Sequence, residues 1–370
     1  LIVRPTSETL FCEHYAKIVN SYRDLPKKYN QWCSVVRWEK TTRPFLRGAE
    51  FLWQEGHTIH ATEQEARDEV KLIHGYYVDL AKNLLAIPMV TGRKTEKEKF
   101  AGAEETYTME ALMHDGKALQ SATSHYFGQN FSIPFNIKFL DKDNKQKYVY
   151  QTSWGLSTRI LGAVIMVHGD NNGLVLPPRV APTQVIIVPI QQQKPGVLDK
   201  AYEIEASLKA AGLRVKVDAS DKSPGWKFSD AEMRGIPVRI EIGPKDIEAG
   251  HVVVAKRNDG SKQTMDINES LATNIQQLLD VIHDEMYQKA LNHLQTNTHT
   301  VSSYDEFKET LETKGGYLKA MWCGDMACEE KIKEETGATT RCIVDGPAHS
   351  ENCVYCGKKA KKVVYFAKAY

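Results

Sequence analysis

The sequence has no apolar run as long as the roughly eighteen residues that a membrane-spanning helix needs. It also lacks an excess of charge: the formal net charge of the 370 residues is +1. Such a chain has no global attraction to nucleic acid, so any contact with RNA must come from local patches. No signal-peptide pattern precedes the first polar motif at Arg4. These absences predict a protein without a membrane association.

Cysteine is scarce in most of the chain, because five of the seven cysteines follow residue 320. So few thiols cannot form a disulfide framework for a chain of this length, whose 42% hydrophobic content suffices for two or three domains with cores. The usage therefore predicts metal binding or free thiols in a reducing cytoplasm. Cys12 and Cys33 lie far from the others in sequence, and we assign them no role.

The late cysteines include two pairs. Cys323 and Cys328 are separated by four residues, and Cys353 and Cys356 by two. Paired cysteines at these spacings are typical of a tetrahedral zinc site with four thiolate ligands. We predict a structural zinc ion here, with free thiols as the alternative. Two further residues are left over from this pattern, Cys342 as a spare and His349 as a possible substitute ligand.

The Rossmann fingerprint and the Walker P-loop are both absent, which argues against a parallel nucleotide-binding fold. The stretch from Val35 to His57 nevertheless has the pattern of an antiparallel hairpin. Two β-patterned runs, Val35–Glu39 and Glu50–His57, flank a polar, basic turn that contains Arg47.

The side chains of this hairpin are unusual for a core strand. Alternation places Arg37 and Glu39 on one face of the first run. The second run places on one face two aromatic rings, a carboxylate and an imidazole, from Phe51, Trp53, Glu55 and His57. Aromatic plates suit a base, guanidinium groups suit phosphate, and carboxylates suit amines. The alternative is an exposed hairpin held by salt bridges.

The hairpin resembles motif 2 of the class II aminoacyl-tRNA synthetases. The motif F-L-R-x-x-E-F-L-W-Q-E-G-H at Phe45–His57, together with R-P-T-S-E at Arg4–Glu8, is similar to motifs of the prolyl-tRNA synthetases of the archaeal and eukaryotic type. Q-T-S-W-G-L-S-T-R at Gln151–Arg159 resembles motif 3, in which a strand turns into a helix that carries an arginine. The resemblance covers essentially the whole chain.

The resemblance implies that the chain attaches proline to tRNA(Pro) through a prolyl-adenylate, with ATP and Mg²⁺. The implied catalytic residues are Arg37 and Arg159. The implied ATP-binding residues are Arg37, Glu39, Arg47, Phe51, Gln120, Thr123, Ser157 and Arg159. The implied proline-binding residues are Thr6, Glu8, Arg37, Trp53, Glu55, His57, Phe100 and His125.

Several of these residues have ordinary alternatives. Thr6 and Glu8 suit the capping of a helix that we expect over Thr9–Ser21. Gln120, Thr123 and His125 suit a solvated strand face, and their assignment depends on the family. Thr62-Glu63-Gln64-Glu65 is a capping box that predicts the start of a scaffold helix.

After Pro182 the pattern alternates. It predicts strands at Val185–Pro189, Leu213–Val217, Val238–Ile242 and Val252–Lys256, helices at Leu198–Ala211 and Leu271–Leu294, and a short helix at Ala231–Arg234. This mixed α/β domain resembles the class IIa anticodon-binding domain. Arg239 and Glu241 share a strand face and could read guanine edges in the anticodon; a surface ion pair with Lys245 or Arg257 is the alternative.

The predicted fold is an α+β class II core built on an antiparallel sheet (1–180), a mixed α/β anticodon-binding domain (183–284) and a small zinc-binding α+β domain (285–370). The chain starts at Leu1 without Met, within a strand-like run at Leu1–Val3, and we expect a preceding segment. The resemblance implies that this segment holds motif 1 and much of a homodimer interface. It also implies that Tyr370 approaches the catalytic domain rather than ending a frayed tail.

Three other functions remain open from the residues. One is a class II synthetase for threonine, serine or glycine. The second is a non-catalytic RNA-binding relative, which the presence of Arg37, Glu39, Phe51 and Arg159 disfavours. The third is a ligase that adenylates a small carboxylate without tRNA, which the separate α/β domain disfavours.

Overall fold

The computed structural model describes residues 4–370 and divides into two compact units. The first unit contains the chain up to Leu80 together with Met89–Ala163 and Leu294–Tyr370; the second contains Ala81–Pro88 and Val164–His293. The strand expected at Leu1–Val3 lies outside the described residues. Among residues 4–370, no helix has both the length and the apolar character that crossing a membrane requires.

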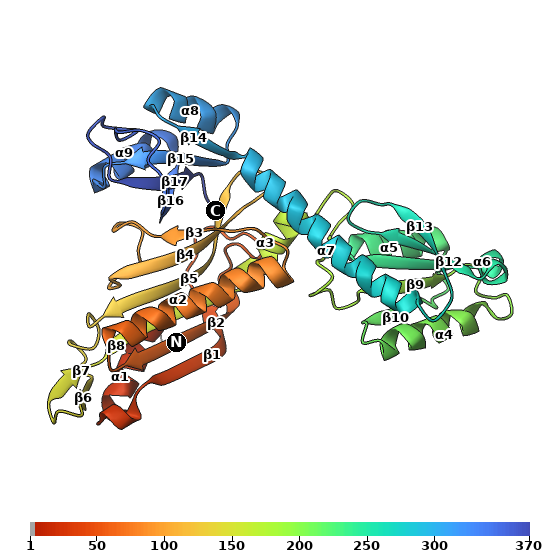
Figure 1. Cartoon of the computed structure of the whole chain (residues 1–370), viewed down its shortest axis with the longest axis horizontal. Helices are drawn as coiled ribbons and strands as arrows, with labels where there is room; N and C mark the ends of the chain where they lie inside the picture. The colour runs from red at the N-terminus through yellow and green to blue at the C-terminus, as the bar shows by residue number, and fades with distance from the viewer. Residues whose placement is uncertain (1–3) are drawn as a thin grey trace. The chain divides into compact units, whose positions relative to one another are not determined.

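One ten-stranded sheet forms the centre of the first unit (Figure 1). Its strands, in spatial order, are β1 (Lys27–Val36), β2 (Glu50–His60), β8 (Tyr150–Ser157), β5 (Ala118–Gly128), β4 (Glu105–Leu112), β3 (Val90–Arg93), β16 (Thr339–Val344), β17 (Lys362–Ala367), β15 (Tyr317–Trp322) and β14 (Thr298–Val301). All neighbouring strands pair antiparallel except β14 and β15. The antiparallel core predicted from the sequence is confirmed.

Short elements surround this sheet. They are α1 (Ser7–Ile18), the 3₁₀ helix η1 (Tyr22–Asp24), α2 (Glu63–Asp79), the hairpin β6 (Lys138–Leu140) and β7 (Gln146–Tyr148), α8 (Tyr304–Thr313) and α9 (Met326–Thr336). The π-helical turn η2 (Leu80–Leu84) follows α2, and α3 (Arg159–His168) follows β8.

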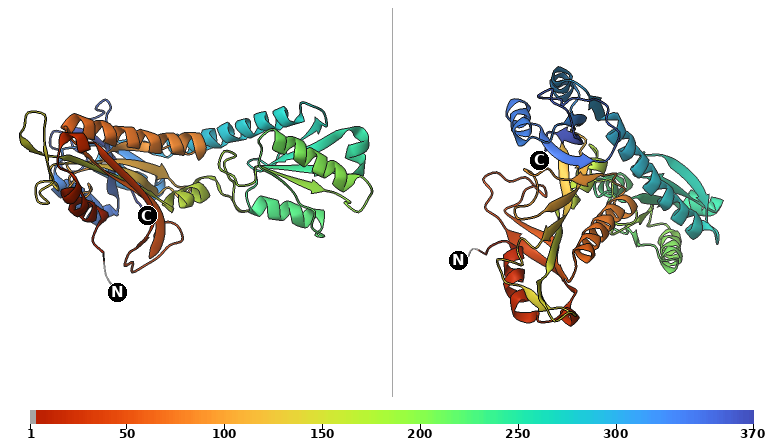
Figure 2. Two further views of the ribbon diagram at one scale, coloured as in Figure 1. Left: turned by 90° about the horizontal axis from the view of Figure 1, so that it is seen from below. Right: turned by 60° about the vertical axis from the view of Figure 1, so that its left-hand side comes forward.

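Helix α2 covers one face of the sheet, as the left view of Figure 2 shows. It begins at the predicted capping box, in which Thr62 and Glu65 bond each other's backbone N–H groups. Ala66 and Val70 pack with Tyr126 beneath the helix, and the Ser124 hydroxyl donates to the Val70 carbonyl at 3.0 Å. Because strand side chains alternate, the neighbours of Ser124 point to the opposite face.

The motif 2 hairpin forms as predicted, but the bounds of its first strand were wrong. Strand β1 starts at Lys27 rather than Val35 and ends at Val36. Arg37 adds one more ladder bond, from its N–H to the Ala49 carbonyl at 2.8 Å, whereas Glu39 lies beyond the strand. Strand β1 is at the sheet edge and mostly exposed, so its polar residues lack the alternation that marks a half-buried strand.

The C-terminal segment continues the ten-stranded sheet. Strand β16 pairs with β3 through Ile343 and Arg93, and Gly92 permits this close approach because a Cβ there would lie 2.3 Å from the Ile343 carbonyl oxygen. At the chain end, the Tyr370 N–H donates to the Ala118 carbonyl at 3.2 Å and its hydroxyl donates to Asp115. The last residue is therefore anchored, and the frayed-tail alternative is wrong.

The second unit contains a mixed five-stranded sheet in the order β10 (Val215–Val217), β9 (Val185–Pro189), β11 (Val238–Ile242), β12 (His251–Lys256) and β13 (Lys262–Asp266). The first three strands are parallel and the last two antiparallel, which confirms the mixed sheet. Its helices are α4 (Val197–Ala210), α5 (Pro224–Met233), α6 (Pro244–Ala249) and α7 (Leu271–Thr296).

The short helix expected at Ala231–Arg234 is longer than predicted. Helix α5 starts at Pro224, where the Ser223 hydroxyl accepts from the Trp226 N–H and proline occupies the first turn. The domain boundaries proposed near residues 180 and 285 stay predictions.

Candidate active site

A cavity of about 410 Å³ opens on the sheet face opposite α2. It collects the predicted ligand-binding residues from the start of α1, the motif 2 hairpin, β5, and the β8–α3 junction. The predicted residues that line it are Thr6, Glu8, Arg37, Glu39, Arg47, Phe51, Trp53, Glu55, Phe100, Gln120, Thr123, His125, Ser157 and Arg159. His57 is the one predicted ATP- or proline-binding residue that does not border it.

The start of α1 brings a carboxylate to one end of the cavity. Glu8 accepts hydrogen bonds from Thr6 and, at 3.0 Å, from the Ser153 hydroxyl. Thr6 is the N-cap residue of α1, but its side chain makes no capping bond. The helix-capping alternative for this pair is therefore wrong, and both side chains face the cavity.

Glu55 forms a fixed carboxylate deeper in the same end, with only 4% of its surface exposed. One oxygen accepts from the Ser7 hydroxyl at 2.6 Å and from the Gln31 amide, and the other lies 3.1 Å from His57 Nε2. Burial raises the pKa of Glu55, but the hydrogen bonds from His57, Ser7 and Gln31 outweigh burial and leave the pKa below its usual range. Glu55 is thus an anion at neutral pH.

His57 lies behind Glu55 and stacks on Phe11 with ring centroids 4.2 Å apart. The Tyr15 hydroxyl donates to its backbone carbonyl at 2.7 Å. The Phe11 ring and Glu55 therefore hold the imidazole, whereas Tyr15 holds the backbone.

His125 and Phe100 form a wall of the cavity, with ring centroids 4.9 Å apart. The Nδ1 atom of His125 lies 2.9 Å from the Thr106 hydroxyl, and Nε2 lies 3.0 Å from the Thr123 hydroxyl. Burial, assisted by the nearby His57, lowers the pKa of His125 to about 3. The ring is therefore neutral at physiological pH and does not repel a bound ammonium group.

The opposite end of the cavity is cationic and open. The exposed Arg37 places its guanidinium carbon 5.2 Å from the Phe51 ring centroid and 5.4 Å from that of Trp53. Arg47 pairs with Glu39 at 3.4 Å, and the Arg47 side chain is about half exposed. These side chains can stack on a base and bind phosphate.

Arg159 is the better-fixed cation of this end. It is the first residue of α3, and its Nε donates to the Leu46 carbonyl at 2.9 Å and its Nη1 to the Gln120 carbonyl at 3.4 Å. Burial and then the charges of Arg47 and Arg37 lower its pKa. Because guanidinium carries five N–H donors, donors remain for a phosphate oxygen. The three arginines make a site for a polyanion.

Four supporting residues were not predicted from the sequence. Ser7 and Gln31 donate to Glu55, Ser153 donates to Glu8, and Thr106 bonds His125. Ser7 lies within the motif R-P-T-S-E and Ser153 within the motif that resembles motif 3, so both positions carried a sequence signal. Gln31 and Thr106 had none, since each acts from a neighbouring strand.

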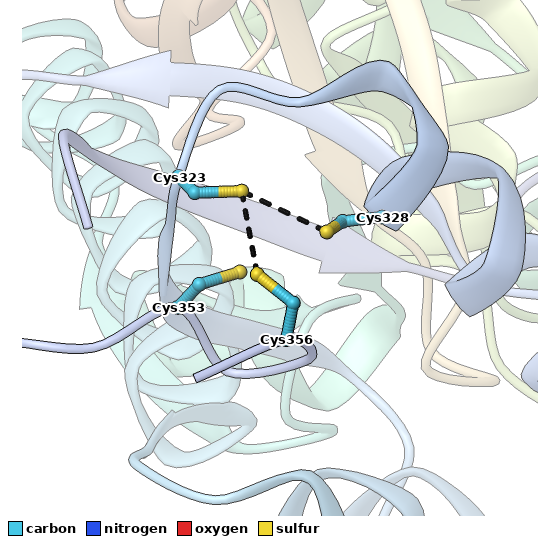
Figure 3. Close-up of side chains that lie close together, drawn as sticks. All are labelled: Cys323, Cys328, Cys353 and Cys356. Atoms are coloured by element: carbon cyan, nitrogen blue, oxygen red, sulfur yellow. Dashed lines mark hydrogen bonds between the residues drawn. The ribbon is translucent and has the colours of Figure 1, made fainter. Parts of the chain in front are cut away.

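The four paired cysteines converge in the C-terminal segment (Figure 3). Their sulfur atoms all lie within 4.8 Å of one another, and Cys323 Sγ lies 3.7 Å from both Cys328 Sγ and Cys356 Sγ. Four thiolates about 2.3 Å from a tetrahedral zinc ion lie about 3.8 Å apart, so the donor set fits zinc.

The two residues left over from the cysteine pattern lie outside this cluster. Cys342 is buried on β16, and His349 lies near the Val301 carbonyl, with 3.3 Å between Nε2 and O. Among the described residues, neither belongs to the group of potential metal ligands.

The predicted anticodon pair lies in the second unit. Arg239 donates to Glu241 through Nε at 3.1 Å and Nη2 at 3.0 Å, and Lys262 donates to the same carboxylate oxygen at 2.7 Å. The alternative of a surface ion pair with Lys245 or Arg257 is wrong, because Arg239 and Glu241 are buried and pair with each other, while Arg257 pairs with Asp170. Arg239 and Lys262 also line a cavity of about 310 Å³.

Family models match three successive parts of the chain. The tRNA synthetase class II core domain (G, H, P, S and T) matches residues 1–168, the anticodon binding domain matches 184–278, and the C-terminal part of prolyl-tRNA synthetase matches 304–370. Together with the antiparallel sheet and the cationic cavity, these matches define a class II aminoacyl-tRNA synthetase.

The similar proteins narrow the class. The chain is 62% identical to the proline–tRNA ligase of Lachnospira eligens and 61% identical to that of Lachnoclostridium phytofermentans, in each case over 100% of this chain and 77% of the relative. A crystal structure of the prolyl-tRNA synthetase of Cryptosporidium parvum, complexed with L-proline and AMP, matches with a TM-score of 0.95 and 42% identity, over 100% of this chain and 78% of that one.

The chain belongs to the prolyl-tRNA synthetase family and is a ligase. The archaeal and eukaryotic type within this family stays a prediction.

Proposed function

We propose that this enzyme activates proline with Mg²⁺-bound ATP and transfers the prolyl group to tRNA(Pro). The proline carboxylate attacks the α-phosphate, a bond forms between the carboxylate oxygen and phosphorus, and pyrophosphate leaves. A ribose hydroxyl at the tRNA terminus then takes the prolyl group and AMP leaves. The observation that carries this proposal is a single cavity with amine-binding carboxylates at one end and phosphate-binding arginines at the other.

The arginines supply the electrostatic part of the reaction. Arg37, at the cationic end, lies beside Phe51 and Trp53, and we assign it contacts with both the carboxylate and the α-phosphate. Arg159 offers its remaining donors to phosphate. Positioning and charge stabilisation by these groups can account for most of the acceleration, and no side chain need act as a nucleophile.

On the nucleotide side, we assign the base and phosphates to the rest of the open end. Phe51 stacks under adenine, and Glu39 and Arg47 contact the nucleotide from the turn that follows β1. Gln120, Thr123 and Ser157 bind it from β5 and β8. Their support is their position along the cavity.

On the amino-acid side, we assign the ammonium group of proline to Thr6 and Glu8. A ring ammonium has two N–H donors, which suits one hydroxyl and one carboxylate. Trp53, Phe100 and His125 surround the pyrrolidine ring. Glu55, held by His57, supplies a second negative charge at the end that binds the ammonium group.

We attribute selectivity mainly to shape. None of the described residues that line the cavity is a cysteine, and the Cys33 thiol, which accepts from Trp53 Nε1 at 3.1 Å, lies beside that lining. Apolar shape alone discriminates by about 1–3 kcal/mol per methylene. We therefore expect weak activation of alanine or cysteine and none of threonine.

The test is ATP–pyrophosphate exchange by the full-length protein with each of the twenty amino acids, followed by charging of tRNA(Pro). We expect exchange with proline far above all others and charging of tRNA(Pro). Threonine, serine or glycine as the best substrate would overturn the assignment of the pocket. Exchange without any charging of tRNA would favour a ligase that only adenylates a carboxylate.

We propose that Arg239 and Glu241 take part in reading the anticodon. Arg239 can donate to guanine O6 and N7, and the carboxylate can accept from its amino group. Arg239 also packs over the Phe228 ring, 4.2 Å from its centroid, which holds the guanidinium in place. Charging kinetics with anticodon variants of the tRNA, compared for Arg239→Gln and the unaltered enzyme, test this assignment.

We propose that Cys323, Cys328, Cys353 and Cys356 bind one structural zinc ion, which links the turn after β15 to the turn before β17. Metal analysis should find about one equivalent per chain, and Cys328→Ser should lower both the metal content and the midpoint of thermal unfolding. Cys342→Ser is the matched control, because this thiol is buried but outside the cluster. Fresh protein without metal would contradict the proposal.

We also infer a homodimer and a cytoplasmic enzyme. Trp32, Val36 and Trp38 on and after the edge strand β1 are 80%, 75% and 99% exposed, which suits an interface with a second copy. None of the seven cysteines, all of which lie among the described residues, forms a disulfide, which suits a reducing compartment. Sedimentation of the full-length protein tests the dimer, and Trp38→Ser should weaken it.

A further inference from the structure

A second row of polar side chains lies beside the ligand-binding row on the same sheet face. On β4, Thr106 and Thr108 pair with His125 and Thr123 of β5, and Glu110 pairs with Gln120. Paired residues of antiparallel strands project on the same face. Glu110 therefore stands next to the ATP end of the cavity, one strand away.

Glu110 is fully buried and is held by two cations from distant parts of the chain. Lys94 Nζ lies 2.7 Å from one carboxylate oxygen. Arg341, on β16 of the C-terminal segment, donates to the other oxygen through Nε at 3.1 Å and Nη2 at 2.8 Å. Thr108 adds a hydrogen bond at 2.8 Å. Removing Arg341 would leave Glu110 paired with Lys94 through one oxygen, while the other buried oxygen would lose both of its donors.

The cluster reaches the ATP site through the backbone of β5. The strand register shifts between Met109 and Glu110, so that Ser121 forms a bulge directly after Gln120. The Gln120 carbonyl then accepts from Arg159 Nη1 at 3.4 Å. The pairing of Glu110 with Gln120 thus connects the buried cluster to the carbonyl that Arg159 contacts.

The charges around Arg159 act in both directions. Burial and the charges of Arg47, Arg37 and Arg341 lower the pKa of Arg159, whereas the carboxylate of Glu110 raises it. Arg341 and Lys94 in turn fix Glu110 as an anion, because their charges keep the pKa of Glu110 low although burial raises it.

We propose that Arg341 is a positioning residue for the use of ATP, acting through Glu110 on Gln120 and Arg159. It rests on the proposed function only in that the cationic end of the cavity binds ATP. The C-terminal segment then contributes to adenylate formation as well as to stability.

The experiment compares Arg341→Met with Lys97→Met in the full-length protein. Lys97 pairs with Glu330 at 2.9 Å, which is an ion pair between the same two parts of the chain that does not touch Glu110. In ATP–pyrophosphate exchange, we expect Arg341→Met to lower kcat/KM for ATP by about ten- to a hundredfold, with the KM for proline changed less than about twofold. Lys97→Met should change neither.

Two further variants separate positioning from folding. Arg341→Lys keeps a charge near Glu110 and should recover part of the lost activity, and it carries the test if Arg341→Met does not fold. Adding Glu110→Gln to Arg341→Met should cost little more than the single change, because both act through one pair.

Binding of a non-hydrolysable ATP analogue, measured by calorimetry without an amino acid, makes the result independent of the proline assignment. Arg341→Met should bind the analogue about tenfold more weakly than Lys97→Met does. Equal binding by the two variants, or equal losses in the kinetics of ATP and proline, would overturn the proposal. A change of best amino acid in the unaltered enzyme would instead count against the proposed function.

Discussion

The two ends of the cavity are built differently. At the amino-acid end, the carboxylate of Glu55 and the ring of His125 are buried, and each is held by at least two hydrogen bonds. At the ATP end, Arg37 and Arg47 are exposed, and the contacts of Arg37 are with aromatic rings.

This difference separates selection from charge stabilisation. A compact substrate with few polar groups must be recognised by shape and by fixed donors and acceptors, which requires side chains already in place. A flexible polyanion can instead order long arginine side chains as it binds. The amino-acid end should therefore move little on binding, whereas the ATP end should adjust.

The largest expected effect comes from Arg37, for which we propose contacts with both substrates. Arg37→Ala should lower proline-dependent exchange by about a hundred- to a thousandfold, because a charge-assisted contact in the transition state is lost. Lys40→Ala, an exposed cation in the turn that follows β1, is the control. Near-normal exchange by a folded Arg37→Ala protein would contradict this role.

A smaller effect, confined to the amino-acid end, is expected from Glu8. Glu8→Gln should raise the KM for proline by about ten- to a hundredfold, since a hydrogen bond to a charged group is weakened, and should leave the KM for ATP nearly unchanged. Glu13→Gln, on the exposed side of α1, should change neither. An unchanged KM for proline in Glu8→Gln would remove the carboxylate from the proline site.

The third effect is on stability. Because the pKa of His125 is about 3 in the folded protein against an ordinary 6.5, the unfolded state takes up this proton first as the pH falls. The stabilising contribution is present above pH 6.5 and is lost as the pH falls toward 3. When the pH falls from 7 to 5, the free energy of unfolding decreases by about 2 kcal/mol through this histidine.

Urea unfolding of the unaltered protein and of His125→Gln at both pH values measures this contribution. The difference in the free energy of unfolding between the two proteins should shrink at pH 5, because only the unaltered protein loses the contribution of His125. The other buried histidines are present in both proteins, so their contributions cancel. A difference independent of pH would mean that His125 titrates normally in the folded state.

The smallest effect is expected at the open end. Phe51→Ala should raise the KM for ATP by about three- to tenfold, which corresponds to roughly 1 kcal/mol of lost stacking, and should affect the KM for proline less. Leu52→Ala, the exposed neighbour on the other strand face, is the control. Equal effects on both substrates would argue against adenine stacking on Phe51.

The sequence predicted most of the residues that line the cavity, because these residues lie in long, characteristic motifs. It could not predict the polar edge strand β1, which lacks an apolar face, nor the roles of Gln31 and Thr106, which act across strand pairs. Nor could the sequence predict the pairing of β3 with β16, where Gly92 permits the close approach. No local pattern relates residues so far apart in the chain.

The most direct test of the contrast between the two ends is a pair of crystal structures of the full-length protein, one free and one with proline and a non-hydrolysable ATP analogue. We predict that the side chains of Glu55 and His125 move by less than about 1 Å between them. Arg37 and Arg47 should change rotamer and become ordered on the phosphates. A rearranged amino-acid end beside unchanged arginines would contradict this account.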